Sequence, residues 1–183
     1  MHYYQLVMAT DDRWTLSICR EFPDGSPVDK WAYTRCQTLA SPSPVPFQVR
    51  VQGDAVDYNS TAFGCLVVST RMGQIIEEIS PDEIQRIPAL VDAEGDWEVL
   101  NLLHCVDCID FERSDIQFYP DDHPEKAGKP RGVKKLRISG ASVGSCHIFR
   151  PRDWTVAEIV SEKVKQALEG NGIKGIEYWP VTE

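Results

Sequence analysis

The sequence VSTRMGQIIE, residues 68–77, recurs without a gap as VSEKVKQALE, residues 160–169. Valine, serine, glutamine and glutamate coincide, and three further positions exchange similar side chains. The same offset of 92 residues carries IQRIP, residues 84–88, onto IEYWP, residues 176–180, so that isoleucine and proline coincide as well. Self-similarity at a fixed offset indicates a repeated structural unit. We therefore expect the fold to be built around two related segments.

Each copy has the pattern of a strand, a helix and a second strand. A short β-branched run precedes Ser69 or Ser161, and each serine is placed to accept a hydrogen bond from the first free N–H groups of a helix. In the first copy the apolar residues from Met72 to Ile79 follow the i, i+3, i+4, i+7 spacing of one buried helical stripe. The pattern predicts strand-helix-strand pseudo-repeats at about 66–88 and 158–180, with the two serines as helix caps and not as nucleophiles.

The segment SPDEIQRIP, residues 80–88, carries two conflicting signals. Ser80, Pro81 and Glu83 resemble the start of a helix, but Pro88 would interrupt that helix within two turns. The matching end of the second copy, GIEYW, favours a strand. We therefore predict a strand at residues 84–87.

Much of the remaining chain has the composition of β-strands. The extended segments are 3–8, 14–20, 47–51, 97–106, 116–119, 133–138 and 145–150. We expect residues 116–119 to return against 97–106 after a turn near 112–114, and residues 120–132 to form a surface loop. The sum predicts an α+β fold, mostly antiparallel sheet with few helices. We expect one domain over residues 1–183, with a strand-rich N-terminal part at 1–58.

Neither a basic leader nor an apolar run of the length that a membrane helix needs is present in the sequence. We therefore expect a cytoplasmic protein that does not span a membrane. In a reducing compartment its cysteines should remain thiols, and we interpret them as small buried side chains. The six cysteines are Cys19, Cys36, Cys65, Cys105, Cys108 and Cys146.

Charge is unevenly distributed along the chain. Between Asp92 and Glu125 there are eleven acids and one base, Arg113, although the formal charge of the whole chain is only −9. Six bases and no acid follow between Lys126 and Arg137. A concentrated negative field speeds encounter with a cationic partner and opposes contact with nucleic acid. The alternative is that the two charged stretches are solvated faces that neutralise each other.

One group of residues suggests metal or redox chemistry. Cys105, Cys108, Cys146 and His147 are of the types that hold zinc or form a redox pair, but only one C-x-x-C is present. If residues 99–109 form a strand, Cys105 and Cys108 point to opposite faces. We therefore expect no metal and no cofactor, and a zinc- or redox-linked protein is the alternative function. The stretch GASVG, residues 140–144, has the spacing G-x-S-x-G, but it lies between two expected strands instead of opening a helix, so we interpret it as a hairpin turn. The sequence has no H-E-x-x-H or phosphate-loop motif, which argues against an enzyme.

Several segments together resemble immunity family eleven of bacterial polymorphic toxin systems. They are the two Val-Ser helix starts, WEVLN at 97–101, VDCID at 106–110, IFR at 148–150 and GIKGIEYWP at 172–180. The resemblance covers about residues 60–181. It implies a small cytoplasmic bacterial protein, encoded beside a toxin that is often a nuclease, which binds and blocks that toxin. It carries over no catalytic residue, and the basic stretch 126–137 has no counterpart in it.

Together these observations predict an immunity protein that neutralises a cognate toxin, a cationic nuclease, by occluding its active site. We expect no direct contact with nucleic acid and leave a homodimer open. Interfaces depend on a few anchors, and we expect Trp97, Phe118 and Tyr119 to be exposed aromatic ones. The expected toxin-binding residues are Asp92, Glu94, Asp96, Trp97, Asp115, Phe118, Tyr119, Asp121, Asp122 and Glu125.

Overall fold

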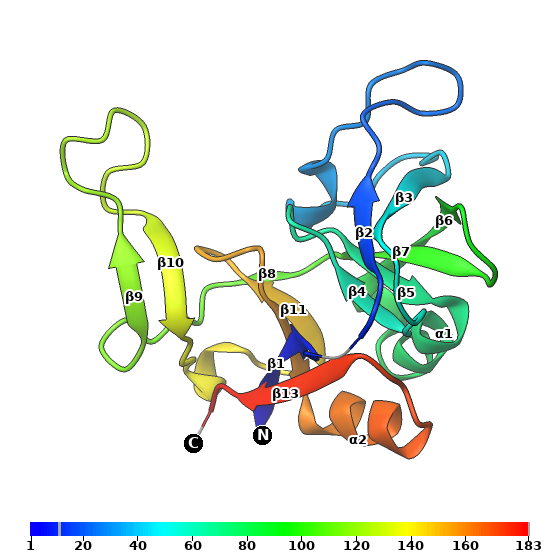
Figure 1. Ribbon diagram of the computed structural model, residues 1–183. Coiled ribbons are helices and arrows are strands. Elements are labelled where there is room, and N and C mark those ends of the chain that lie inside the picture. Colours follow the sequence, from blue (N-terminus) through cyan, green and yellow to red (C-terminus); the bar gives the residue numbers. More distant parts are fainter. Residues whose placement is uncertain (11, 183) are drawn as a thin grey trace.

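The computed structural model describes residues 1–10 and 12–182, which form two α-helices and thirteen strands in three sheets (Figure 1). The helices are Thr70–Ile79 (α1) and Glu162–Gly170 (α2). The strands are Tyr3–Met8 (β1), Thr15–Ile18 (β2), Val45–Val51 (β3), Tyr58–Ser60 (β4), Leu66–Ser69 (β5), Ile84–Val91 (β6), Trp97–Leu102 (β7), Cys105–Val106 (β8), Asp115–Phe118 (β9), Pro130–Lys135 (β10), Ile148–Pro151 (β11), Glu158–Ser161 (β12) and Ile176–Pro180 (β13).

The sheets are mainly antiparallel. One has the order β13-β1-β12-β11-β8, the second has the order β2-β3-β6-β7-β5-β4, and β9 and β10 form a two-stranded ribbon. Only two neighbouring pairs within the described ranges are parallel, β3 with β6 and β8 with β11. An α+β fold of mostly antiparallel sheet with few helices is therefore confirmed.

The two segments singled out by the sequence are β5-α1-β6 and β12-α2-β13. In each, a strand from elsewhere lies between the two strands of the segment and runs antiparallel to both. That strand is β7 in the first segment and β1 in the second. The expected strands and helices are confirmed, and so is the strand at residues 84–87, which follows a short 3-10 turn at Pro81–Glu83. The internal duplication itself stays a prediction.

Serine caps both helices. Ser69 Oγ accepts a hydrogen bond from Met72 N at 3.3 Å, and Ser161 Oγ accepts one from Val164 N at 3.4 Å. Each bond satisfies one of the N–H groups that a helix leaves free at its start. The interpretation of these serines as caps is confirmed. Neither helix of the described chain has the length and apolar character needed to cross a bilayer.

Proline within β6 and β13 is tolerated because of where it lies. Leu103 N, just after β7, donates to Glu83 O, just before β6. In the same way Val181 N, just after β13, donates to Tyr3 O on β1. Because ladder bonds alternate along a strand, the backbone of Pro88 and Pro180 faces away from these partners. Pro88 precedes the point where β3 begins to pair, and β13 is an edge strand. The missing N–H therefore breaks no ladder bond.

The strand predicted at 97–106 is interrupted, and the prediction that residues 116–119 pair with it is wrong. The chain leaves β7 after Leu102 and continues as β8, which pairs in parallel with β11 through Arg150 N donating to His104 O at 2.9 Å. Residues 115–118 pair instead with β10, whose strand begins at Pro130, inside the segment expected to be a loop. Hydrophobic alternation identifies a strand but not its partner.

One apolar cluster joins the two large sheets and both helices. It contains Leu6 and Val160 from the five-stranded sheet, Leu66 and Leu100 from the six-stranded sheet, and Met72, Ile76, Val164 and Leu168 from the helices. Each of these side chains is at most 2% exposed. Burial of apolar side chains supplies most of the stabilisation of a fold, and through this cluster the two sheets and both helices share one apolar core.

A buried ion pair lies at the same junction. Arg150 on β11 and Glu158 on β12 have side chains that are 0% and 3% exposed, with Nη1 and Oε1 3.2 Å apart. Arg150 also donates to Gly64 O at 2.8 Å and to Thr155 O at 2.6 Å. Hydroxyl groups of Tyr58 and Ser60 donate to the Glu158 carboxylate, each at 3.3 Å. The pair therefore connects the five-stranded sheet to β4 and to the turn after it.

The structure corrects the expectation that all cysteines are thiols. Cys36 and Cys105 form a disulfide with Cα atoms 5.7 Å apart and a sequence separation of 69 residues. The other four, Cys19, Cys65, Cys108 and Cys146, are free. The pairing could not be read from the sequence, because Cys36 lies in a loop that only the fold brings to β8. The disulfide fastens this loop, next to the six-stranded sheet, to β8 of the other sheet.

We predict that Arg150→Met lowers the free energy of unfolding by about 3–5 kcal/mol, because it leaves Glu158 buried without a counter-charge. The double variant Arg150→Met/Glu158→Gln should recover at least half of this loss, measured by urea denaturation at pH 7. Burial raises the pKa of Glu158, so its ionisation costs stability as the pH rises. The deficit of Arg150→Met should therefore shrink as the pH falls and Glu158 becomes neutral. A deficit that grows in acid would contradict this account.

The disulfide gives a second prediction. Alkylation of the denatured, unreduced protein should label four cysteines, and labelling of six would contradict the pairing. Closing a loop of this length stabilises a fold by up to about 4 kcal/mol. Cys36→Ser should therefore lower the free energy of unfolding by up to that amount in non-reducing buffer and have little effect in dithiothreitol. Cys19→Ser, at a half-buried free thiol, is the matched control.

Candidate functional site

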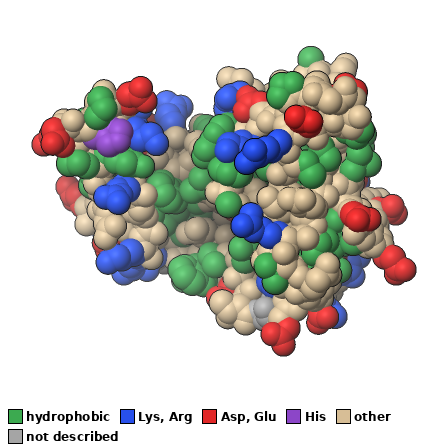
Figure 2. Space-filling model, turned by 45° about the horizontal axis from the view of Figure 1, so that its top comes forward, with side chains coloured by type: hydrophobic (Ala, Val, Ile, Leu, Met, Phe, Trp, Pro, Cys, Tyr) green, Lys and Arg blue, Asp and Glu red, His purple; other side chains and the backbone are tan. Residues whose placement is uncertain are grey.

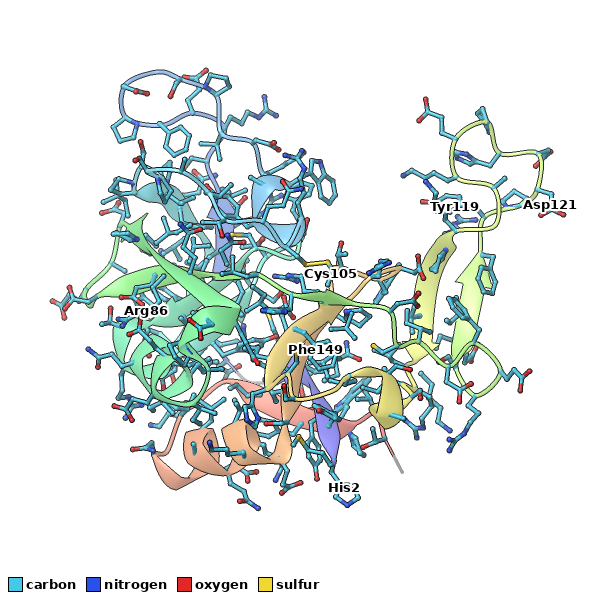
Figure 3. The ribbon with its side chains drawn as sticks, turned by 180° about the vertical axis from the view of Figure 1, so that it is seen from behind. His2, Arg86, Cys105, Tyr119, Asp121 and Phe149 are labelled. Carbon is cyan, nitrogen blue, oxygen red and sulfur yellow. A yellow bond between two sulfur atoms is a disulfide. The ribbon has the colours of Figure 1, made fainter. Side chains whose placement is uncertain are left out.

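The acidic segment predicted to bind a partner divides between two ends of the molecule. Asp92, Glu94 and Asp96 lie in the turn that joins β6 to β7, whereas the acids from Asp115 to Glu125 lie on and beyond β9. Figures 1 and 3, seen from opposite sides, place this turn and the β9-β10 ribbon at opposite ends. The charges adjacent in sequence therefore do not form one continuous surface.

At the β6-β7 turn, the three acids are exposed but the aromatic residue is not. Trp97 is 9% exposed, packs against Trp14 with ring centroids 4.9 Å apart, and donates from Nε1 to Glu94 O at 3.3 Å. The expectation that Trp97 is an exposed anchor is therefore wrong, because side chains alternate along β7 and Trp97 shares the core-facing side with Val99. A partner that docks at this turn would contact the exposed acids but not the Trp97 ring.

The other acids belong to a projecting arm, which we define as residues 115–135. In it β9 and β10 pair through Phe118 with Pro130 and Ile116 with Val133, and the loop between them extends the ribbon outward (Figure 1). Asp110 N donates to Arg137 O at 2.9 Å, which closes the base of the arm. In Figure 2 the arm is a separate lobe with a hollow between it and the rest of the molecule.

An exposed aromatic pair lies on the arm and at its base. Phe118 on β9 is 46% exposed, and Phe111, from the turn before β9, is 45% exposed. Their ring centroids are 6.2 Å apart. Phe118 was expected to be exposed and is. Phe111 was not predicted. Its position in the sequence, across a turn from Phe118, is the feature that could have identified it.

Side chains at the outer end of the arm contact one another. Tyr119, half-buried, meets His123 edge-on with ring centroids 4.8 Å apart, and the Lys126 Nζ lies 5.2 Å from the Tyr119 ring. His123 Nδ1 accepts hydrogen bonds from the backbone N–H groups of Glu125 and Lys126. Tyr119 is thus less exposed than expected, and its ring helps to order the loop instead of projecting from it.

The arm is not an acidic surface as a whole. It carries four acids, Asp115, Asp121, Asp122 and Glu125, which are all exposed. It also carries five bases, Lys126, Lys129, Arg131, Lys134 and Lys135, so its net formal charge is +1. The basic stretch noted in the sequence therefore lies on the same ribbon as the acids. A partner that binds this arm would need complementary charges of both signs.

The possible metal and redox residues do not come together. Cys105 is in the disulfide, Cys108 is buried, and burial raises the Cys108 pKa to about 12, which disfavours the thiolate that binds metal. Cys146 Sγ lies 3.8 Å from His104 Nδ1, and His147 Nδ1 lies 2.8 Å from Ser161 Oγ. Within residues 1–10 and 12–182, no group of three or more His, Cys, Asp and Glu is arranged to hold a metal ion.

The contact between His147 and Ser161 has the composition of a nucleophile and its base. Ser161, however, is 0% exposed and caps α2, so no substrate can approach its hydroxyl group. The neighbouring Glu83 carboxylate accepts hydrogen bonds from the backbone N–H groups of His147 and Ile148 at 2.8–3.0 Å. These contacts hold β11 against the start of β6, which is a structural role.

Comparison with known proteins supports the resemblance seen in the sequence. The model of the immunity protein family Imm11 matches residues 19–183. The match begins well before residue 60, where the resemblance in the sequence begins, and so includes β3 and β4 of the six-stranded sheet, whereas β2 ends one residue before it. Comparison with curated proteins finds no match. Because the family model covers most of the chain, the protein belongs to the Imm11 immunity protein family.

Proposed function

We propose that this chain neutralises its cognate toxin by placing the arm, residues 115–135, over the toxin's active site. Membership of an immunity protein family supports a role in toxin immunity and implies a toxin as the binding partner. The observation that carries the finer proposal is the exposed aromatic pair Phe111 and Phe118 on a ribbon that projects from the folded core.

A two-stranded ribbon buries little apolar surface by itself and is only marginally stable in water. Here Phe111 and Phe118 are each nearly half exposed, which leaves apolar area that a partner would remove from water. Aromatic side chains are the common anchors of protein interfaces, because they bury a large area at a small entropy cost. We therefore assign Phe118 and Phe111 as the anchors in place of the buried Trp97.

The outer loop carries negative charge at Asp121, Asp122 and Glu125, although the five bases of the arm bring its net formal charge to +1. Nucleases bind phosphates through basic surfaces, so a cationic nuclease is a partner that this charge fits. Active sites are concave, and a narrow projecting arm has the shape to enter one. Asp115, Phe118 and Tyr119 would then lie on the docking surface. Asp92, Glu94 and Asp96, at the other end of the molecule, would lie outside it.

We predict that Asp121→Lys/Asp122→Lys weakens binding of the toxin encoded beside this chain, because it removes attraction to a cationic surface. The dissociation constant should rise by at least about ten-fold at low salt, with a smaller change at high salt, since exposed charges are screened. Asp92→Lys/Glu94→Lys makes the same change of charge at the β6-β7 turn and should leave binding within about two-fold. Isothermal titration at two ionic strengths measures both. Equal loss in the two variants would contradict docking by the arm.

A second prediction concerns the anchors. Phe111→Ala/Phe118→Ala should reduce toxin affinity by at least about thirty-fold, as expected for loss of interface anchors. Both rings are half exposed, so the midpoint of urea unfolding should change little. Trp179→Ala removes a similarly exposed aromatic ring from β13 and should keep full affinity. Protection of growing cells from the co-expressed toxin should follow the same order. Full protection by the double variant would exclude Phe111 and Phe118 as anchors.

A further inference from the structure

The six-stranded sheet curls until its edge strands β2 and β4 lie beside each other without pairing (Figure 1). A cavity of about 560 Å³ lies between them and is lined by Leu16, Ile18, Asn59 and Ser60, among others. A second cavity of about 830 Å³ continues from it and shares some of its residues. We call the two together the β2 groove. The shared residues are Ser17, Ile18, Arg50 and Phe63.

Backbone groups of both edge strands face this gap. Cys19 N donates to Pro46 O on β3, so the alternation of an antiparallel ladder turns the N–H and C=O groups of Leu16 and Ile18 away from β3. On β4, Thr61 N donates to Cys65 O, which in the same way turns the backbone of Ser60 away from β5. A row of unpaired N–H and C=O groups is a template for an added strand.

The groove is positively charged. Its charged lining residues include Arg20, Lys30 and Arg50, against one acid, Asp29, whose carboxylate is already 2.7 Å from Arg35 Nη1. Arg50 lines both cavities and is exposed, and its side chain makes no hydrogen bond or ion pair with the part of the chain that the structure describes. A cation held next to open strand edges favours an anionic occupant.

Two further features support an extended occupant. The wall beside Arg50 is aromatic, because Phe63 packs edge-on against Trp31 with ring centroids 5.2 Å apart, and Lys30 Nζ lies 3.9 Å from the Phe63 centroid. Asn59 lines the groove, and its Oδ1 is buried with no hydrogen-bond partner within the described residues. A buried acceptor without a donor is costly, and the N–H groups of an added chain are donors.

We propose that the β2 groove binds an extended acidic segment of the toxin, which pairs with the open edge of β2 and places a carboxylate against Arg50. This inference rests on the toxin-binding function proposed above and adds a second contact of different chemistry. The arm supplies apolar anchors and acids, whereas the groove supplies backbone hydrogen bonds and bases. The two contacts together would require the toxin to present a basic surface and an acidic strand.

Hydrogen exchange, followed residue by residue by NMR in the complex with the toxin, tests strand addition. The amides of Leu16 and Ile18 should become at least about ten-fold more protected, since hydrogen-bonded amides exchange only on opening. The amide of Ser17 already faces β3 and should change much less. A complex in which the arm is protected but Leu16 and Ile18 exchange as in the free protein would overturn the inference and leave the arm's function standing.

A charge reversal tests the acidic partner. Arg50→Glu should raise the dissociation constant for the toxin by at least about ten-fold, with a smaller effect at high salt. Lys163→Glu makes the same change on an exposed position of α2, away from the groove, and should stay within about two-fold. Unchanged binding by Arg50→Glu would refute the groove alone. If the unmodified chain does not bind the toxin at all, the proposed function and this inference both fail.

Discussion

The guanidinium group of Arg150 is completely buried where the two large sheets meet. A charge in such a place is tolerated only when it is paired and hydrogen-bonded, and here Nη1 and Nη2 are bonded whereas Nε has no partner among the described residues. Its partners come from three parts of the chain: Glu158 on β12, Thr155 before it and Gly64 after β4. These parts must therefore be held in register, and Tyr58 and Ser60 extend the same network into β4. The Arg150 network thus adds polar contacts between the five-stranded sheet and β4 to the apolar cluster that the two large sheets share.

Local chemistry made part of this fold predictable. Ser69 and Ser161 cap their helices because a serine hydroxyl accepts a hydrogen bond from the N–H groups that a helix leaves free at its start. Pro88 excluded a helix in its segment, because proline interrupts a helix, and the segment forms a strand. The two segments that share this chemistry also share a topology, each with a foreign strand in the middle. Nothing in the local pattern identified β7 and β1 as those strands, because strand pairing depends on contacts far apart in sequence.

The same limit explains what was missed at the candidate site. Cys36 and Cys105 meet across 69 residues, and residues 115–118 pair forward with β10 instead of back with β7. Counting charges along the chain suggested one acidic face, but the β6-β7 turn and the arm lie at opposite ends. Trp97 was expected to be exposed among acids, yet its strand register buries it against Trp14. Arg50 could not be identified from the sequence as a candidate, because only the curling of the sheet places it at the gap between the edges of β2 and β4.

The segment that carries the arm leaves the body after Asp110 and returns at Arg137, and a hydrogen bond joins these two residues. A segment whose ends already meet can be exchanged at a small cost of loop closure, provided that Val133 and Leu136, which pack in the apolar cluster of Tyr3 and Phe149, are kept. Residues between these ends can therefore change with little effect on the Arg150 network or on the cluster shared by the helices. With the arm as the proposed recognition surface, an immunity protein built in this way can change its recognition of a toxin without a change in the scaffold that carries the arm.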